Sequence, residues 1–359
     1  MWDSIEKKVH AGERISEEEA VWLYRTPDIY RLGRLASHVR EKKNGRKATY
    51  VRNMHLNYSN VCIYDCHFCS FYRKEGASGS WEMDLDSVFQ YAAKSQFHQL
   101  SEVHIVGGVH PKLPYEFYLE MLRGLKERYP KLHLKGFTAT EIDHLSRISG
   151  KSLEDLFTEL REAGLDSLPG GGAEIFAKRV WDQICSRKAK PDRWLEIHKA
   201  WHQMGGKSTC TMLYGHIETV EERVDHMRRL RDLQDETGGF AAFIPLCFQV
   251  ENNRLSHIPK VSANTDLRVH AVARLYLDNF DHIKAYWIMT GLKMAQVLLS
   301  FGVDDIDGTV LEERVVHMAG ADSPLGVTEN ELRALIEEAG FEPVLRDTLY
   351  HSLEPSSQI

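Results

Sequence analysis

Three of the chain's six cysteines lie within eight residues, at Cys62, Cys66 and Cys69. This C-x3-C-x2-C spacing puts three thiolates on one short loop, where they can converge on a single metal centre. An iron–sulfur cluster normally takes four cysteines, and a structural zinc site is likewise closed by four ligands. His67 is a poor fourth ligand because it lies between two ligands on the same tight loop. The spacing therefore predicts a metal centre with one open position; a structural metal knuckle and three unrelated core cysteines are the alternative interpretations.

The spacing resembles that of the radical S-adenosylmethionine superfamily. In that superfamily three cysteines hold a 4Fe–4S cluster, and the remaining iron binds the amino and carboxylate groups of S-adenosylmethionine. The resemblance implies that Cys62, Cys66 and Cys69 are the metal ligands. It also implies that Phe68, the aromatic residue before the last cysteine, lies near the adenine.

The bulk composition narrows the class of protein. A chain of 359 residues is long enough for two domains or one large α/β barrel. Its formal charge of −7 argues against a nucleic-acid partner. No apolar run is long enough to span a membrane, and the N-terminus has no apolar signal core, so we expect a cytoplasmic protein. In that compartment clustered cysteines are ligands, whereas the dispersed Cys185, Cys210 and Cys247 are expected to be buried small hydrophobes.

Short apolar runs alternate with amphipathic helices along most of the chain, which is typical of βα units. Eight such units predict an α/β fold of the TIM-type (β/α)8 barrel, with its chemistry at the C-terminal ends of the strands. We expect an N-terminal helical leader over residues 1–52, the barrel over 53–320, and a C-terminal helix and tail packing on it over 321–359, with a disordered polar end. The expected strands are 49–57, 101–106, 133–138, 165–168, 207–214, 240–248, 282–289 and 304–308.

Capping signals mark several of the expected helices. Ser16 with Glu19 forms a capping box in the leader, and Thr328 with Glu331 forms one in the C-terminal helix. A further helix is expected to begin after Ser152.

Two glycines, Gly107 and Gly108, follow the second expected strand and permit close backbone approach to a ligand. They resemble the superfamily's glycine motif, which implies a backbone contact with the methionine part of the cofactor. The acidic third residue of that motif is absent here. Glu141, after the third strand, is the best candidate to accept hydrogen bonds from ribose hydroxyls; the alternative is a carboxylate that caps a helix N-terminus.

The fifth strand runs into a segment that resembles the superfamily's adenine-binding motif. Leu213, Gly215 and Glu218 match that motif, and Thr211 replaces a glycine. Glu218 has the alternative role of ordering the following helix. Three consecutive glycines follow the fourth strand, and Gly171 among them is expected to contact the substrate; a simple tight turn is the alternative.

Longer segments resemble the futalosine-pathway enzymes of menaquinone biosynthesis. Within that group, residues 282–287 and 304–309 are most similar to the aminodeoxyfutalosine synthases, while the dehypoxanthine futalosine cyclases and the deazaflavin-forming radical enzymes are similar over much of the same length. The segments that carry the resemblance to the group are 104–108, 168–175, 211–218, 243–246 and 277–287.

For the synthases, the resemblance implies the substrate 3-[(1-carboxyvinyl)oxy]benzoate and a one-electron donor such as flavodoxin or ferredoxin. S-adenosylmethionine would be consumed as a co-substrate, because its 5′-deoxyadenosyl radical adds to the vinyl carbon. Aryl migration and loss of carbon dioxide would then give 6-amino-6-deoxyfutalosine.

The substrate carries two carboxylates, so its pocket should offer cations or strong hydrogen-bond donors. His282 and Lys284 have the same parity on the seventh strand and are expected to face the pocket together as catalytic and substrate-binding residues; a solvent-side pair is the alternative. Asn57, Asp305 and Asp307 lie near strand ends and are further candidates for substrate contacts.

Two rival classes make different predictions. A non-enzymatic iron–sulfur or zinc protein would form a compact metal domain and would not need eight βα units. A radical enzyme that modifies transfer RNA would need a basic surface or an RNA-binding domain, and the sequence shows neither.

Overall fold

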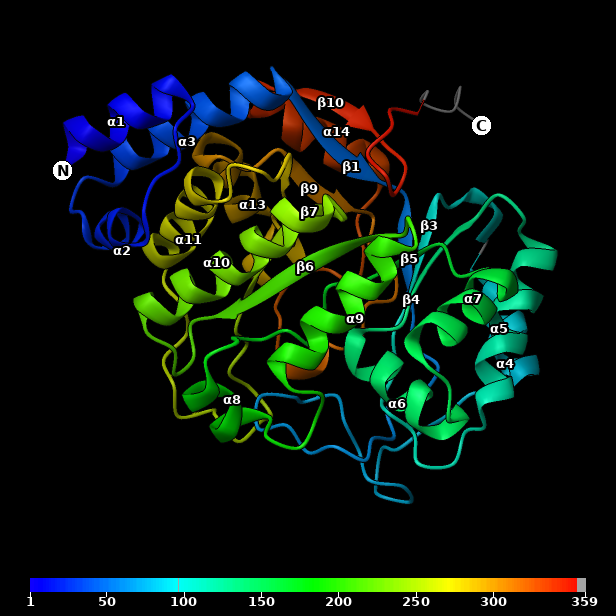
Figure 1. Cartoon of the computed structure of the whole chain (residues 1–359). Coiled ribbons are helices and arrows are strands. Elements are labelled where there is room, and N and C mark those ends of the chain that lie inside the picture. Colours follow the sequence, from blue (N-terminus) through cyan, green and yellow to red (C-terminus); the bar gives the residue numbers. More distant parts are fainter. Residues whose placement is uncertain (96, 354–359) are drawn as a thin grey trace.

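The computed structural model describes residues 1–95 and 97–353, and the strands of this part form two parallel sheets. Seven strands pair in chain order from β2 to β8 in a sheet that curls on itself, and helices cover its outer side (Figure 1). The other sheet has the order β10-β1-β9. The strands are β1 (Lys47–Val51), β2 (Asn53–Leu56), β3 (Glu102–Ile105), β4 (His133–Gly136), β5 (Ser167–Leu168), β6 (Lys207–Tyr214), β7 (Phe240–Cys247), β8 (His282–Ile283), β9 (Asp305–Gly308) and β10 (Glu342–Leu345).

Strand β9 joins the two ends of the curled sheet. On one side the amide of Asp304 donates to the carbonyl of Ile283 at 3.2 Å, and the amide of Ala285 donates to the carbonyl of Asp305 at 2.8 Å. On the other side β9 pairs with β1, in which Thr49 lies opposite Asp305. Because β1 leads directly into β2, these bonds close the ring, and the predicted α/β barrel is confirmed.

Two of the expected strands differ most from the observed ones. The first, expected as 49–57, is divided at Arg52, because β1 pairs with β9 and β10 whereas β2 pairs with β3. The seventh, expected as 282–289, is wrong beyond Ile283, since the chain turns there into the short helix α12 (Trp287–Thr290). The indole of Trp287 donates to the carbonyl of Gly308 at 2.8 Å and holds this turn against β9.

The capping signals read from the sequence are confirmed. Ser16 with Glu19 and Thr328 with Glu331 both form capping boxes. The side chain of Ser152 caps its helix by accepting a hydrogen bond from the amide of Asp155. The remaining helices are α1 (Trp2–Ala11), α2 (Glu17–Arg25), α3 (Ile29–Asn44), α4 (Leu85–Lys94), α5 (Tyr115–Arg128), α6 (Ala139–Ser149), α7 (Leu153–Ala163), α8 (Lys178–Ile184), α9 (Pro191–Gln203), α10 (Val220–Thr237), α11 (Ala263–Tyr276), α13 (Leu292–Leu298) and α14 (Glu329–Glu338).

Strands from the N-terminal and C-terminal parts of the chain lie side by side. Strand β10, which was not predicted, pairs with β1 of the leader, and α3 packs on α11 (Figure 1). The domain boundaries at residues 52 and 320 stay predictions, and the polar tail 354–359, predicted to be disordered, lies outside the described residues. No helix in the described ranges is long and apolar enough to cross a membrane.

The strands divide their side chains between two environments. Val103 and Ile105 of β3 point to the helices and are fully buried in the apolar core. Glu102 and His104 alternate with them and line a cavity inside the barrel. The polar interior of the barrel is therefore encoded by the period-2 alternation of its strands.

Candidate active site

The cysteine loop, residues 57–73, follows β2 at the C-terminal end of the strands. It is tied at its base, where the amide of Cys62 donates to the carbonyl of Arg73 at 3.0 Å, and closed at its tip, where the amide of Cys69 donates to the carbonyl of Cys66 at 3.2 Å. Lys74 donates to the carbonyl of Cys62 at 3.3 Å. All three thiols are free and half-buried. Three soft ligands on one ordered loop fit the predicted 4Fe–4S cluster.

Burial raises the pKa of all three thiols, that of Cys66 to about 12. Binding of iron must therefore displace protons from the loop. Among the described residues, no group of three or more His, Cys, Asp or Glu side chains is arranged to hold a single metal ion.

The glycine turn after β3 packs directly on the cysteine loop. A Cβ atom on Gly108 would lie 2.3 Å from the carbonyl oxygen of Val61, and one on Gly107 would lie 2.5 Å from the ring of Tyr58. The amide of Gly108 also donates to the carbonyl of Ser59 at 2.7 Å. The glycines thus permit a close approach between two parts of the chain, and their contact with S-adenosylmethionine stays a prediction.

Glu141 does not have the free carboxylate that a ribose contact requires. Its oxygens accept hydrogen bonds from the hydroxyl of Tyr58 at 2.8 Å, the amide of Gly107 at 3.0 Å and the amide of Thr138 at 2.8 Å. Thr138 and Glu141 form the capping box of α6. The structure corrects the ribose prediction, because the helix-capping alternative uses both oxygens and also fixes the glycine turn.

Glu218 likewise serves the turn on which it lies. It accepts from the amide of Gly215 at 2.6 Å and from the amide of His216 at 2.9 Å, and it pairs with Arg223 of α10. Gly215 has a φ of 92°, which favours glycine. Leu213 is buried at the end of β6. Glu218 therefore orders the start of the following helix, as the alternative interpretation held, while the adenine contacts of Leu213 and Gly215 stay predictions.

A buried ion pair beside the cysteine loop was missed from the sequence. Lys188 pairs with Glu174, and its ammonium group lies 5.4 Å from the ring centroid of Phe68. Cys185 is buried, as predicted, and lines with Cys66 a small cavity of about 70 Å³. No local motif could have joined these residues, because α8 and the loop after it carry Lys188 and Cys185 to the cysteine loop from more than 100 positions away.

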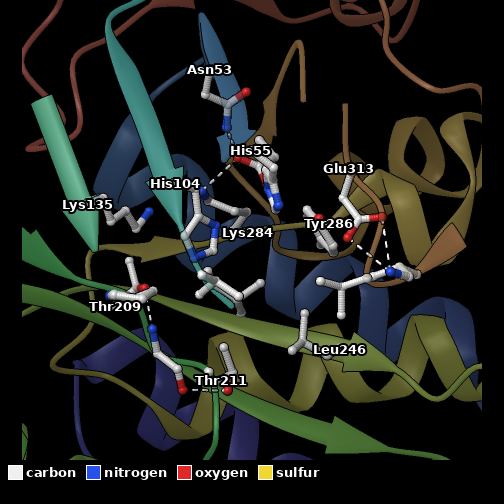
Figure 2. A pocket seen from close by; sticks show the side chains of 18 of the residues that line it. Asn53, His55, His104, Lys135, Thr209, Thr211, Leu246, Lys284, Tyr286 and Glu313 are labelled. Carbon is white, nitrogen blue, oxygen red and sulfur yellow. Dashed lines mark hydrogen bonds and ion pairs between the residues drawn. The ribbon is translucent and has the colours of Figure 1, made fainter. Parts of the chain in front are cut away.

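A larger cavity of about 180 Å³ occupies the interior of the barrel (Figure 2). Side chains from the strands and from the loop after β9 line it. Its walls toward the C-terminal ends of the strands are mainly apolar but include Tyr286 and Glu313, and five side chains define what we term the polar floor. The apolar residues include Val106, Ile244, Leu246, Met289 and Val316, and the floor residues are His55, Glu102, His104, Lys135 and Lys284.

The polar floor contains two buried lysines, each with an acidic partner. The ammonium group of Lys135 lies 3.4 Å from Glu102, and that of Lys284 lies 3.0 Å from Asp307. Burial lowers the pKa of Lys135, with Glu102 opposing the shift. Burial opposes the ionisation of Glu102, but Lys135 and Lys284 outweigh it and lower the pKa of that carboxyl group. Both ion pairs are therefore held inside the barrel by mutual attraction.

Two histidines complete the floor. The rings of His55 and His104 meet edge to face with their centroids 4.6 Å apart. Burial lowers the pKa of both imidazoles, which are therefore neutral in this cavity. The Nδ1 atom of His55 and the Nε2 atom of His104 are buried and have no hydrogen-bond partner in the described part of the chain.

Three of the residues predicted to bind substrate line this cavity. They are Lys284, Asp307 and Gly171. A Cβ atom on Gly170 would lie 2.4 Å from the backbone of Cys210, so that glycine is needed for packing on β6, whereas one on Gly171 would meet only a methyl group at 3.1 Å.

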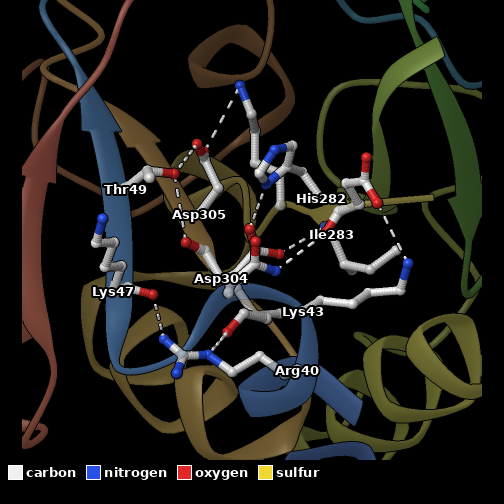
Figure 3. A network of polar contacts seen from close by, with 12 residues as sticks. Arg40, Lys43, Lys47, Thr49, His282, Ile283, Asp304 and Asp305 are labelled. Atoms are coloured by element: carbon white, nitrogen blue, oxygen red, sulfur yellow. Dashed lines mark hydrogen bonds and ion pairs between the residues drawn. The ribbon is translucent and has the colours of Figure 1, made fainter. Parts of the chain in front are cut away.

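His282, Asp305 and Asn57 do not line the cavity. The structure corrects the expectation that His282 shares the pocket with Lys284, since its Nδ1 atom lies 2.6 Å from Asp304 (Figure 3). Its ring also stacks on Tyr350. At the same end of the barrel, Asp305 accepts a hydrogen bond from Thr49 at 2.7 Å and pairs with Arg346. Asn57 donates to the carbonyl of Val106 at 2.9 Å. These groups hold the barrel together and do not face the space inside it.

The fold and the cysteine loop define a radical S-adenosylmethionine enzyme, and the chain belongs to that superfamily. The model of the Radical SAM superfamily matches residues 56–230, and that of the CofH/MqnC C-terminal region matches residues 237–359. Methylornithine synthase has the same fold, with a TM-score of 0.73 at 16% identity over 94% of this chain and 97% of that chain.

Within the superfamily, the chain belongs to the family that contains the aminodeoxyfutalosine synthases. It is 48% identical to the enzyme of that name from Thermus thermophilus, over 97% of this chain and 95% of the relative. The Streptomyces coelicolor aminodeoxyfutalosine synthase is 44% identical, over 97% and 93%. The cyclic dehypoxanthine futalosine synthase of Streptomyces coelicolor is 39% identical, over 96% and 86%.

Proposed function

We propose that this chain is an aminodeoxyfutalosine synthase, which joins the adenosyl group of S-adenosylmethionine to 3-[(1-carboxyvinyl)oxy]benzoate with aryl migration and loss of carbon dioxide. One observation carries the proposal. A three-cysteine loop lies at the C-terminal end of a barrel whose cavity has two buried lysines in its floor. The substrate carries two carboxylates, and the similarity to the named synthases supports the same reaction.

Cys62, Cys66 and Cys69 would hold the 4Fe–4S cluster and leave one iron open for S-adenosylmethionine. When bound, the cluster supplies the electron that releases the 5′-deoxyadenosyl radical. The glycine turn at Gly108 fixes the position of the cysteine loop, since its amide binds the carbonyl of Ser59. Positioning of the two reactants is the main task left to the protein.

Lys284 would donate hydrogen bonds to a substrate carboxylate from the polar floor. Asp307 orients its ammonium group at 3.0 Å and balances its charge while the cavity holds no anion. The apolar walls around Leu246 and Met289 exclude water from the reacting carbon.

We also propose that flavodoxin or ferredoxin supplies the electron and that the chain acts in the cytoplasm. Reductive cleavage of S-adenosylmethionine needs a one-electron donor. The six cysteines, all within the described residues, are free, as expected in a reducing compartment.

The experiment that tests the proposal follows the adenine. Adenine-labelled S-adenosylmethionine is incubated anaerobically with reductant and reconstituted protein, in one reaction with the enol ether and in a parallel reaction with dehypoxanthine futalosine. A synthase puts the label into a product heavier than 5′-deoxyadenosine. If the label appears only as 5′-deoxyadenosine while dehypoxanthine futalosine is consumed, the chain is a cyclase and the proposal is wrong. Cys66→Ala serves as the control without cleavage.

A further inference from the structure

Three polar residues of the floor form a row across neighbouring strands. His55 of β2 lies opposite His104 of β3, and His104 lies opposite Lys135 of β4. All three line the cavity, and Figure 2 shows their side chains gathered with Lys284 around the same space. In a packed barrel interior such positions are usually filled by branched apolar side chains. A row of one cation and two imidazoles therefore calls for a polar occupant.

Unpartnered atoms mark where that occupant binds. The Nδ1 atom of His55 and the Nε2 atom of His104 are buried without a partner among the residues described. Buried polar atoms without partners are costly, so a ligand or ordered water must satisfy them. Each neutral imidazole has one ring nitrogen that can donate. The ammonium group of Lys135, with one acidic neighbour at 3.4 Å, has further donors to offer.

We propose that His55, His104 and Lys135 form the subsite for the aromatic carboxylate of the substrate. This inference rests on the proposed function and adds an orientation to it. The ring carboxylate lies on the polar floor, the aromatic ring lies between the apolar walls, and the enol ether points toward the cysteine loop.

The polarity of the cavity supports that orientation. His55, Glu102, His104 and Lys135 lie within β2, β3 and β4, whereas Val106 and Met289 lie beyond the C-terminal ends of β3 and β8. An aromatic acid matches this order when it enters with its carboxylate first. Because the cysteine loop follows the C-terminal end of β2, the opposite end of the substrate is the one that faces it.

Two simple probes separate the two ends of the substrate. 3-Methoxybenzoate keeps the ring carboxylate and lacks the enol ether, whereas 2-phenoxyacrylate keeps the enol ether carboxylate and lacks the ring carboxylate. Lys135→Met should weaken the binding of 3-methoxybenzoate about tenfold or more, the loss expected for one charge-assisted hydrogen bond. It should leave the Kd of 2-phenoxyacrylate unchanged. His104→Phe, which removes both ring nitrogens, should show the same selectivity.

Controls keep loss of fold separate from loss of the subsite. Lys126→Met removes a lysine that pairs with Asp166 on the outside of the barrel at 2.6 Å, and it should change neither Kd. The double variant Lys135→Met with Glu102→Gln removes the buried pair together, and it should match Lys135→Met in its selectivity.

The outcomes are distinct. If Lys135→Met weakens the binding of 2-phenoxyacrylate alone, the substrate lies in the opposite orientation and the inference is overturned. If the variant changes the Kd of neither probe, the three residues bind only water and the inference is likewise overturned. Both Kd values are measured without turnover, so the test of the subsite does not depend on activity. Failure of the enol ether to react would refute the proposed function, and the binding measurements would still test the subsite.

Discussion

Replacement of Gly108 by alanine tests whether the glycine turn positions the cysteine loop. The added Cβ atom would lie 2.3 Å from the carbonyl oxygen of Val61, where an ordinary contact begins at 3.4 Å. The difference, 3.4 − 2.3, requires a shift of about 1.1 Å. A backbone carbonyl cannot rotate aside as a flexible side chain does. The shift must therefore be taken up by the chain that leads into Cys62, one residue further along.

The expected cost follows from that overlap. Insertion of one methyl group into packed structure typically costs about 1–3 kcal/mol. Here the strain falls on the loop that must present three thiolates with fixed geometry. We therefore expect Gly108→Ala to fold with a slightly lower Tm and to bind clearly less iron and sulfide after anaerobic reconstitution.

Gly171→Ala is the matched control. Its Cβ atom would meet only the methyl group of Thr138 at 3.1 Å, on the wall of the cavity. This variant should retain full iron and sulfide content and lose affinity for the aromatic substrate. Equal iron and sulfide in Gly108→Ala and the wild type would refute the positioning role of the turn.

Three further predictions concern single side chains. Cys66→Ala should abolish S-adenosylmethionine cleavage because two thiolates cannot hold the cluster, whereas Cys185→Ala should keep it; an active cluster in the first variant would remove Cys66 from the ligand set. Lys284→Met should weaken the binding of the enol ether by about 1.5–3 kcal/mol, the value of one charge-assisted hydrogen bond, and leave the Kd of S-adenosylmethionine unchanged. Equal weakening of the binding of both ligands would contradict a substrate-specific role. The carboxylate of Glu313 raises the pKa of His317 to about 9, with burial opposing the shift. Protonation of His317 therefore stabilises the fold fully below about pH 6.5, and the contribution is lost as the pH rises through about 9. Between these pH values the Tm of the wild type should fall more than that of His317→Gln. If the two curves of Tm against pH are parallel, the ion pair of His317 with Glu313 contributes nothing to stability.

The cysteine loop and the barrel could be predicted from the sequence because their signals are local. The spacing of Cys62, Cys66 and Cys69 needs only one loop, and the alternation of strands with helices needs only short windows. The role of Glu141 was also readable, since Thr138 three residues before it completes a capping box. The ribose interpretation was wrong because it did not count the donors that a helix start already provides.

Four of the five residues of the polar floor were missed because they are local exceptions to the strand pattern, and Lys284 alone was predicted. His55, Glu102, His104 and Lys135 are polar residues within strands that are otherwise buried, and each alone resembles a surface position. Their period-2 alternation with apolar neighbours was a usable signal, since alternate residues of a barrel strand face its interior. Which strands face one another across the barrel depends on closure. For that reason His282 was wrongly placed beside Lys284, two residues away.

The pairing of β10 with β1 means that a strand from the C-terminal part of the chain lies beside the strand that closes the barrel. Lys47 lies opposite Glu342, and Arg346, just beyond β10, neutralises the buried Asp305 of β9. A nascent chain that has not yet left the ribosome beyond β9 therefore carries a carboxylate without its guanidinium partner at the closing seam of the barrel. Burial of an unpaired charge is strongly unfavourable, so closure of the seam is less favourable without Arg346.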